Sequence, residues 1–430
     1  MKEFAKALRG IPMSDSAPML IALLICTIYG FLSTSTPDKI GSAEVGIAGL
    51  LILMIGVRGA VSPLIFMPGR GAPILIKAMA IFLIVVPTIV GLIFLQNSLI
   101  DYIRDIVPLF YALLPVFIYP RLKRNPDLWL HTLVAALFVA GLGFTVQYYL
   151  DPSIEIDRLI VSQAYGENRD NPWQDPATVF AFTFSLCAAI YFMSKGAIVV
   201  SSAFLLTYSL MMVMYLSTVS RGPIGLSLLA GVATAFLTFR ASTGLRRLAF
   251  IFMLCAFGVA AYMLLSSSAE QLLSGVQMLF DKTDRSGLLN ARDIELRAVL
   301  ENAVDPFILI AGQGWGGLIS NPIGGGAQWS FVHNSFAYFL FKTGIFGLFF
   351  YAAYMAWCLR GYRYVFRRSG DSAWISVLLI VSVPALFVTM LLEVSYKTLT
   401  FGFLLSLLLA AYFSVKNSRT KTSMLPSGKI

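Results

Sequence analysis

A histidine followed by an amide and a hydroxyl is the clearest candidate for acid–base chemistry in this chain. The sequence Val332-His333-Asn334-Ser335 ends a polar stretch and opens a long apolar run, so we expect it at a helix N-terminus. A neutral imidazole accepts a proton from a hydroxyl near neutral pH, and a helix N-terminus favours bound anions. His333 is therefore a candidate base and Asn334 a candidate binding residue. A purely structural histidine is the alternative.

An arginine between two apolar runs is a candidate for holding phosphate. The sequence Ser220-Arg221-Gly222-Pro223 occupies a very short predicted loop between these runs. A guanidinium pinned there by Gly and Pro is well suited to hold a phosphate in a fixed place. The alternative is an interfacial arginine that extends to the lipid headgroups.

Two further arginines, Arg292 and Arg297, lie on a predicted amphipathic helix over residues 291–304. Both can reach one groove beside this helix, where they would add positive charge. Glu295 and Glu301 support an alternative, in which the helix is solvated and its arginines form internal ion pairs.

Lys342 is a charge within a predicted membrane span, and such residues usually face a protein interior or a cavity. Two partners are considered for it, part of an anionic substrate or Glu393.

The elements that position these residues are membrane helices. Only 13% of the 430 residues are charged and 58% are hydrophobic, whereas soluble domains average about 25% charged. The net charge of +10 is spread over short loops, which argues against nucleic-acid binding. The four cysteines lie in apolar runs and only two histidines occur, so no disulfide, metal site or cofactor is expected. We predict an all-α polytopic membrane protein with about twelve spans, near 18–35, 42–57, 73–95, 103–119, 129–150, 175–193, 197–218, 222–239, 248–266, 334–358, 373–393 and 396–415.

The distribution of Lys and Arg predicts the topology. These residues gather in alternate loops and in both tails, which places both termini in the cytoplasm. The predicted organisation is nine spans over 1–266, a large outside loop with short helices over 267–332, three spans over 333–415 and a cytoplasmic tail over 416–430. Within the loop, Gly312, Gly314, Gly316 and Gly317 predict a flexible turn.

Three motifs in this order resemble the O-antigen ligase and polymerase family of bacteria. They are Ser220-Arg221-Gly222 at a helix boundary, Arg292–Arg297 leading through Pro306 to Gly312 and Gly314, and His333-Asn334 followed by Gly344-Ile345-Phe346-Gly347. The match covers about residues 215–350. Lys342 departs from the family pattern, which often has an acidic residue at that place.

The resemblance implies a membrane glycosyltransferase that uses a glycan on undecaprenyl diphosphate. Arg221 and Arg292, with Arg297, would hold the diphosphate, and His333 would orient or deprotonate an acceptor hydroxyl. Asn334 and Lys342 would bind substrate. Trp315 and Trp329 would stack on sugar rings, with burial in the loop as the alternative for at least one of them.

The resemblance also implies a bacterial inner-membrane location with the site facing the periplasm. The expected partners are the lipid-linked donor, a glycan or lipid acceptor and the bilayer, and other polysaccharide-assembly membrane proteins are candidates. Ligase and polymerase activities are both consistent with these motifs. A multi-helix transporter of an anionic or lipid-linked substrate is the alternative function, although the chain lacks the paired repeats common in transporters.

Overall fold

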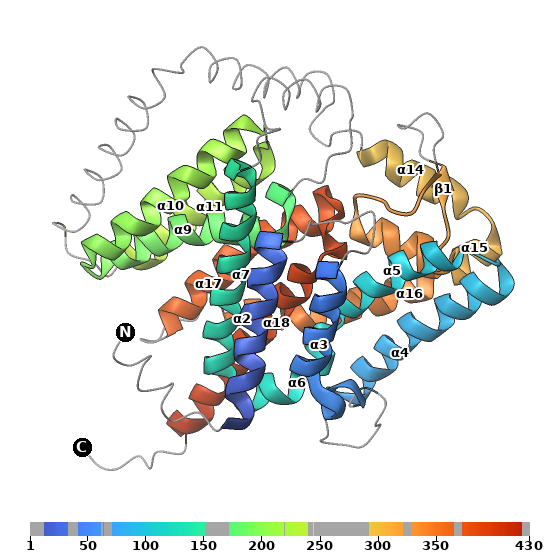
Figure 1. The fold of residues 1–430 in the computed structure, drawn as a ribbon, viewed down its shortest axis with the longest axis horizontal. Coiled ribbons are helices and arrows are strands. Elements are labelled where there is room, and N and C mark those ends of the chain that lie inside the picture. Colours follow the sequence, from blue (N-terminus) through green and yellow to red (C-terminus); the bar gives the residue numbers. More distant parts are fainter. Residues whose placement is uncertain are drawn as a thin grey trace.

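The computed structural model describes residues 13–32, 42–61, 63, 71–150, 172–218, 220–239, 244, 292–320, 328–364 and 372–423. The described chain is almost wholly helical (Figure 1). Its α-helices are α2 (Met13–Leu32), α3 (Ser42–Val61), α4 (Ile74–Thr88), α5 (Leu99–Ala112), α6 (Leu114–Arg124), α7 (Pro126–Leu150), α9 (Pro176–Ser194), α10 (Ile198–Ser217), α11 (Arg221–Phe239), α14 (Arg292–Asn302), α15 (Pro306–Ala311), α16 (Ser335–Leu359), α17 (Ser372–Phe387) and α18 (Leu399–Ser423).

Short irregular elements extend or join these helices. The π-helices η2 (Ile89–Phe94) and η5 (Val388–Leu392) continue α4 and α17. The 3-10 helices are η3 (Pro172–Gln174), η4 (Arg360–Tyr364) and η6 (Val394–Lys397). The strands β1 (Ile319–Ser320) and β2 (Gln328–Trp329) pair antiparallel, with Ile319 opposite Trp329.

The helices confirm the class of an all-α polytopic membrane protein. Eight described helical segments are long and apolar enough to cross a bilayer, and three shorter apolar helices accompany them. The predicted span 248–266 lies outside the described residues, so the total of about twelve stays a prediction.

Several predicted spans differ from the structure, and two of these differences have a clear origin in the sequence. The predicted span 103–119 is formed by α5 and α6, which meet at Leu113, because Pro115 in the first turn of α6 has no N–H to continue the helix. The helix α18 continues to Ser423, past the predicted end at 415. Its polar last turns contain no proline or glycine, so nothing in the sequence stops the helix there.

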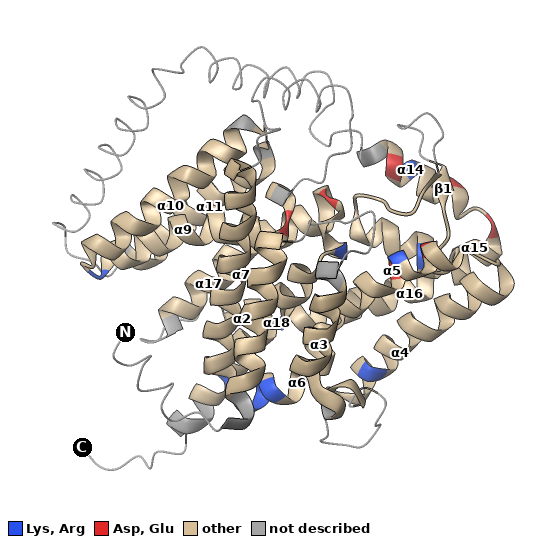
Figure 2. Cartoon of the chain, viewed as in Figure 1, with Lys and Arg blue, Asp and Glu red and all other residues tan. Residues whose placement is uncertain are grey.

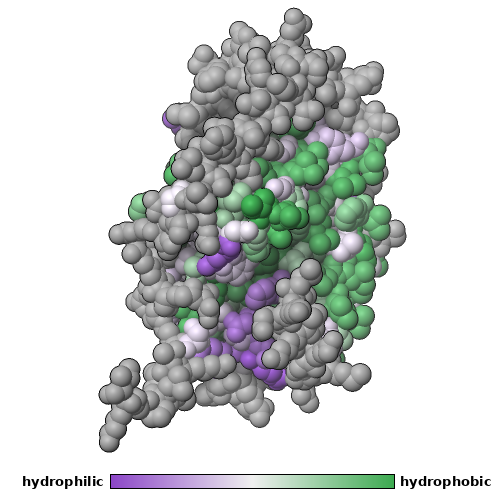
Figure 3. Space-filling view, turned by 90° about the vertical axis from the view of Figure 1, so that its left-hand side faces the viewer, coloured by the Kyte–Doolittle hydropathy of each residue, from purple (hydrophilic) through white to green (hydrophobic). Residues whose placement is uncertain are grey.

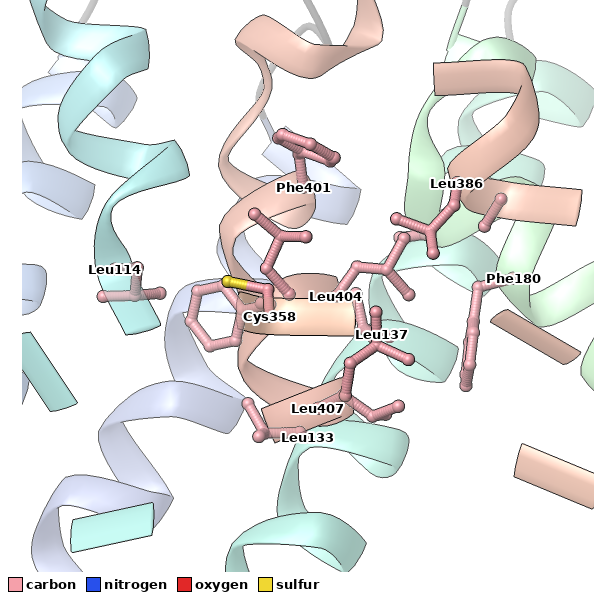
Figure 4. Close-up of a cluster of buried hydrophobic side chains, with 14 of the residues drawn as sticks. Leu114, Leu133, Leu137, Phe180, Cys358, Leu386, Phe401, Leu404 and Leu407 are labelled. Carbon is pink, nitrogen blue, oxygen red and sulfur yellow. The ribbon is translucent and has the colours of Figure 1, made fainter. Parts of the chain in front are cut away.

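The hydrophobic core surrounds α18. From Leu399 to Val415 its side chains are buried on every side, which fits a helix segment that is apolar all round. Figure 4 shows side chains of α6, α7, α9, α16 and α17 gathered around it. Outer helices instead expose large apolar residues, as a lipid-facing surface requires, and Figure 3 shows a hydrophobic area on part of one face. Examples are Val199, Leu206, Leu229, Val232 and Phe236 on α10 and α11.

Figure 2 shows basic residues where α6 ends, and others on α4, near α5 and near α14. The last turn of α6 is basic, and Tyr119 on this helix lies 5.3 Å from the ring of Phe413 on α18. Arg360, just beyond α16, lies 4.1 Å from the ring of Tyr412. His333 lies before the opposite end of α16, about 38 Å of helix away. The predicted cytoplasmic charges and the predicted site thus lie at opposite ends of this helix.

The glycine-rich turn packs against two other backbones. Gly312, Gly314 and Gly344 have φ angles of 76°, 69° and 64°, a region that L side chains rarely adopt. A Cβ at Gly344 would lie 2.2 Å from the carbonyl oxygen of Ile310, and one at Gly314 would lie 2.2 Å from the amide nitrogen of Gly91 in η2. The turn is therefore ordered by close packing against η2 and against a kink in α16, rather than flexible as predicted.

Candidate functional site

The central contact of the site joins His333 to Glu295. The Nδ1 atom of His333 lies 2.8 Å and 2.9 Å from the two carboxylate oxygens of Glu295, and the backbone N–H of His333 donates to the same carboxylate at 3.1 Å. Glu295, on α14, is 5% exposed, and the side chain of His333 is 16% exposed. A carboxylate at Nδ1 favours the tautomer with its proton on Nδ1, which leaves the Nε2 lone pair to accept a proton.

The segment before His333 is held by hydrogen bonds from the connector between α17 and α18. The hydroxyl of Tyr396 donates to the carbonyl of Val332 at 2.6 Å. The ammonium of Lys397 donates to the carbonyl of Ser330 at 3.3 Å. Both donors belong to η6, so the position of the histidine depends on this short helix.

A buried charge cluster anchors the same connector. Asp105 on α5 is 1% exposed, and its carboxylate accepts hydrogen bonds from Lys342 at 2.5 Å and from Lys397 at 2.9 Å. The hydroxyl of Tyr338 and the backbone N–H of Gly316 also donate to it, at 2.8 Å and 2.9 Å. Four donors from α16, η6 and the glycine-rich turn therefore meet on one carboxylate.

Lys342 lies inside this cluster, with a side chain that is 0% exposed. Its ammonium also donates to the carbonyl of Gly317 at 2.5 Å. Glu393 was one of the two partners considered for Lys342, and the carboxylate that the structure pairs with Lys342 is instead that of Asp105. Since no part of the Lys342 side chain reaches the surface, the structure gives it the role of positioning the turn rather than of touching a substrate.

The Ser-Arg-Gly motif lies beside the connector, at the start of α11. The backbone N–H of Ser220 donates to the carbonyl of Tyr215, and the Tyr215 hydroxyl donates to the carbonyl of Trp173 at 2.7 Å. Ser395 of η6 donates to the next carbonyl, that of Gln174, at 2.8 Å. Arg221 is the first residue of α11, as the motif predicts for a helix boundary, but its side chain is outside the described part of the structure.

The two arginines of α14 differ in their placement. Arg292 begins this helix, and its side chain is not among those described. It precedes Glu295 by three residues, so helical spacing places its position on the same side of α14 as Glu295. The side chain of Arg297 is exposed, and its position lies about 200° around the helix from that of Glu295. The solvated-helix alternative therefore fits Arg297, and it does not fit Glu295, which bonds to His333.

Asn334 and Trp315 both have structural contacts. Asn334 caps α16, since its side-chain oxygen accepts from the amides of Phe336 and Ala337 at 2.9 Å and 3.2 Å. Trp315 is 0% exposed, and its indole N–H donates to the carbonyl of Leu83 at 2.9 Å. Burial, the alternative considered for one of the tryptophans, is what the structure gives Trp315. The expected stacking on a sugar does not fit this position.

Sequence reasoning missed Glu295 as a partner of His333, and it missed Asp105, Lys397 and Asp175. Asp105 carried a usable signal, because an acidic residue in a predicted span marks a buried site. Asp175 precedes α9 and is also buried, and its Oδ1 accepts from Ala177 and Thr400 at 2.8 Å and 2.6 Å. Burial raises the pKa of Asp175 to about 7, against the opposing effect of these hydrogen bonds.

Comparisons with protein-family models and with curated proteins find no match for this chain. Within the described residues, no three His, Cys, Asp or Glu side chains gather as a metal ion would require.

Proposed function

We propose that this protein is a membrane glycosyltransferase that moves a glycan from undecaprenyl diphosphate to an acceptor hydroxyl. The proposed site lies outside the cytoplasmic membrane, in the periplasm of a bacterium, where it serves as an O-antigen ligase or polysaccharide polymerase. The acceptor is a glycan or a glycolipid. This proposal joins the motif resemblance to the geometry around His333.

One observation carries the proposal, the pairing of His333 with the buried Glu295. A carboxylate at Nδ1 orients the imidazole and stabilises the imidazolium that forms when Nε2 takes a proton. A transporter that only passes an anion has no need for a base held in this way. The pair also lies next to the start of α16, whose N-terminus favours anions.

The proposed reaction forms one carbon–oxygen bond and breaks another, with transfer of one proton. The acceptor oxygen bonds to the anomeric carbon of the donor, and the bond from that carbon to the diphosphate oxygen breaks. The acceptor proton passes to Nε2 of His333. The leaving diphosphate keeps the electron pair, and positive groups near it lower the barrier as this charge develops.

Arg221 and Arg292 are the proposed diphosphate ligands. Arg221 begins α11 beside the connector, and Arg292 begins α14 on the side of Glu295. A planar guanidinium binds phosphate oxygens in pairs, which an ammonium cannot do. Arg297 is a weaker candidate, because its exposed position lies on another side of α14.

The test is a transfer assay with purified protein in lipid nanodiscs. The donor is a lipid-diphosphate glycan, and the product measured is released undecaprenyl diphosphate. We expect wild-type release, a loss of about 10²–10⁴-fold in His333→Ala, and a loss of about 10²–10³-fold in Arg221→Lys. The matched control is His131→Ala on α7, which removes the other histidine of the chain, whose Nδ1 contacts the carbonyl of Asp127.

The control variant should keep its activity. Absence of release by folded wild-type protein, or equal activity in His333→Ala and His131→Ala, would contradict the proposed function.

A further inference from the structure

The chain leading from β2 to His333 alternates between partly exposed and buried residues. Trp329, Phe331 and His333 are partly exposed, whereas Ser330 and Val332 are 8% and 3% exposed. This alternation is the period of a β-strand, and the segment continues directly from β2. Two aromatic rings and the candidate base therefore share the more open side of one segment.

The three rings of this side form a compact cluster, in which each ring contacts the other two. Trp329 and Phe331 are stacked, with centroids 5.1 Å apart and an angle of 28° between planes. The His333 ring meets both of them edge to face, at 5.8 Å from Phe331 and 6.4 Å from Trp329. We call Trp329 and Phe331 the aromatic shelf.

The opposite side of the segment is held rigidly. The carbonyls of Ser330 and Val332 accept from Lys397 and Tyr396, and Lys397 is in turn bonded to Asp105. The shelf is therefore fixed in place before any ligand arrives. A ligand that packs on it loses little of its binding free energy to ordering the protein.

We propose that the aromatic shelf binds the acceptor sugar, by packing against the apolar C–H face of a pyranose ring. This inference rests on the proposed function, and it names the substrate group that lies beside the base. An aromatic face carries partial negative charge and attracts the weakly positive C–H groups of such a ring. A sugar on the shelf brings its hydroxyls to the edge where His333 lies.

A lipid chain is the competing occupant, since aromatic side chains also gather at membrane interfaces. The observation that favours the sugar is the His333–Glu295 pair, which borders both rings of the shelf. A sugar ring can contact the apolar shelf with its C–H face and the His333–Glu295 pair with its hydroxyls. An acyl chain would instead place hydrocarbon beside the Glu295 carboxylate and the His333 imidazole, which is unfavourable.

The first test measures binding without any donor. Saturation-transfer NMR uses methyl β-D-glucopyranoside and methyl β-D-galactopyranoside as probes, with protein in nanodiscs. In the wild type we expect saturation transfer to the ring protons of the sugar. This signal should be lowered about 3–10-fold in Trp329→Ala and should recover in Trp329→Phe. The control is Phe349→Ala on α16, an aromatic residue that is 63% exposed and far along the helix from His333.

The second test measures transfer kinetics with a soluble acceptor oligosaccharide. Trp329→Ala should raise KM for the acceptor about 3–10-fold and leave KM for the donor unchanged. Phe331→Leu serves as a second variant, with thermal unfolding recorded for each protein.

The outcomes separate this inference from the proposed function. Sugar binding that depends on Trp329, without any transfer by wild type, would keep the shelf and contradict the glycosyltransferase. Transfer with unchanged acceptor KM and unchanged sugar signals in folded Trp329→Ala and Phe331→Leu would overturn the shelf. Signals from lipid acyl chains that respond to Trp329→Ala, with none from the sugars, would assign the shelf to lipid and also overturn the inference.

Discussion

The hydroxyl of Tyr396 donates to the carbonyl of Val332 at 2.6 Å, across 64 residues of sequence. Tyr396 is 3% exposed and belongs to the connector between the last two membrane helices, whereas Val332 directly precedes His333. This contact makes the position of the candidate base depend on the packing of α17 and α18. The same connector meets Asp105 through Lys397.

Removing the Tyr396 hydroxyl should make the candidate base His333 less firmly positioned. In Tyr396→Phe, the carbonyl of Val332 loses a buried donor, which costs about 1–3 kcal/mol of stability. We expect the transfer rate to fall roughly 10-fold or more, because misplacing a catalytic group is costly. Thermal unfolding and kcat are the measurements. The matched control is Tyr362→Phe, which removes a hydroxyl bonded to Ser382 at 2.6 Å. Equal effects in the two variants would show that the contact does not position His333.

The Glu295–His333 pair should behave as a unit. Glu295→Gln keeps the shape but removes the charge that stabilises the imidazolium, so we expect a loss of about 10²-fold or more in kcat. Since Glu295 acts through His333, the double variant with His333→Ala should be no slower than His333→Ala alone. The measurement is a double-mutant cycle on the transfer rate. Losses that multiply would mean that the two residues act independently.

The Asp105 cluster predicts a ranking of stabilities. Asp105→Asn leaves the ammonium groups of Lys342 and Lys397 without their carboxylate, and breaking a buried pair typically costs about 3–5 kcal/mol. Lys342→Met leaves Asp105 still paired with Lys397, so its loss should be smaller. Thermal unfolding in detergent checks the order. A Lys342→Met variant less stable than Asp105→Asn would contradict this account of the cluster.

Asp175 should make stability depend on pH. Its folded-state pKa of about 7 lies above the ordinary value of 3.8, so the folded protein favours the protonated form. The contribution of Asp175 to the free energy of unfolding is greatest below pH 4. It is lost as the pH rises toward 7 and does not change further above pH 7. Between pH 5 and pH 8 the loss is on the order of 2–3 kcal/mol.

The comparison variant for Asp175 is Asp175→Asn, which cannot titrate. Its thermal midpoint relative to wild type should rise from pH 5 to pH 8. A constant difference between the two proteins would mean that Asp175 does not change its protonation in this range.

The orientation of the site is tested by cysteine labelling. Gln328 precedes the aromatic shelf, and Lys195 lies in the turn between α9 and α10, which is predicted to be cytoplasmic. Both side chains are exposed. In a background without the four native cysteines, Gln328→Cys should react with a membrane-impermeant maleimide in spheroplasts, and Lys195→Cys should react only after lysis. The reverse pattern would place the site in the cytoplasm.

The apolar helices were predictable because their signal is local. A run of about 20 apolar residues identifies a span without knowledge of its neighbours, and His333-Asn334 was correctly expected to open a helix. The contacts within the candidate site were less predictable from the sequence. Glu295 and His333 are 38 residues apart, and helical spacing does not say which side of α14 meets the rest of the protein.

Lys342 and Trp315 differ from their predicted roles because tertiary packing determines their contacts. Lys342 pairs with Asp105 because the glycine-rich turn lies between α5 and α16, an arrangement that loop lengths do not reveal. Trp315 is buried because the same turn packs against α4 and η2. A tryptophan in a polar loop looks equally suited to bind sugar or to anchor the loop until its neighbours are known.

The close packing of the glycine-rich turn limits how this protein can be divided into exchangeable parts. Gly314 touches Gly91, and Gly312 touches the backbone of Lys342 beside the kink at Gly344. The glycine-rich turn, η2 and α16 are far apart in the sequence, but their backbones pack so closely at these glycines that a Cβ atom would not fit between them. A chimera that receives the loop of a relative must therefore also receive the matching turns of η2 and α16. The acceptor specificity that we propose for this site therefore cannot be transplanted by grafting the loop alone.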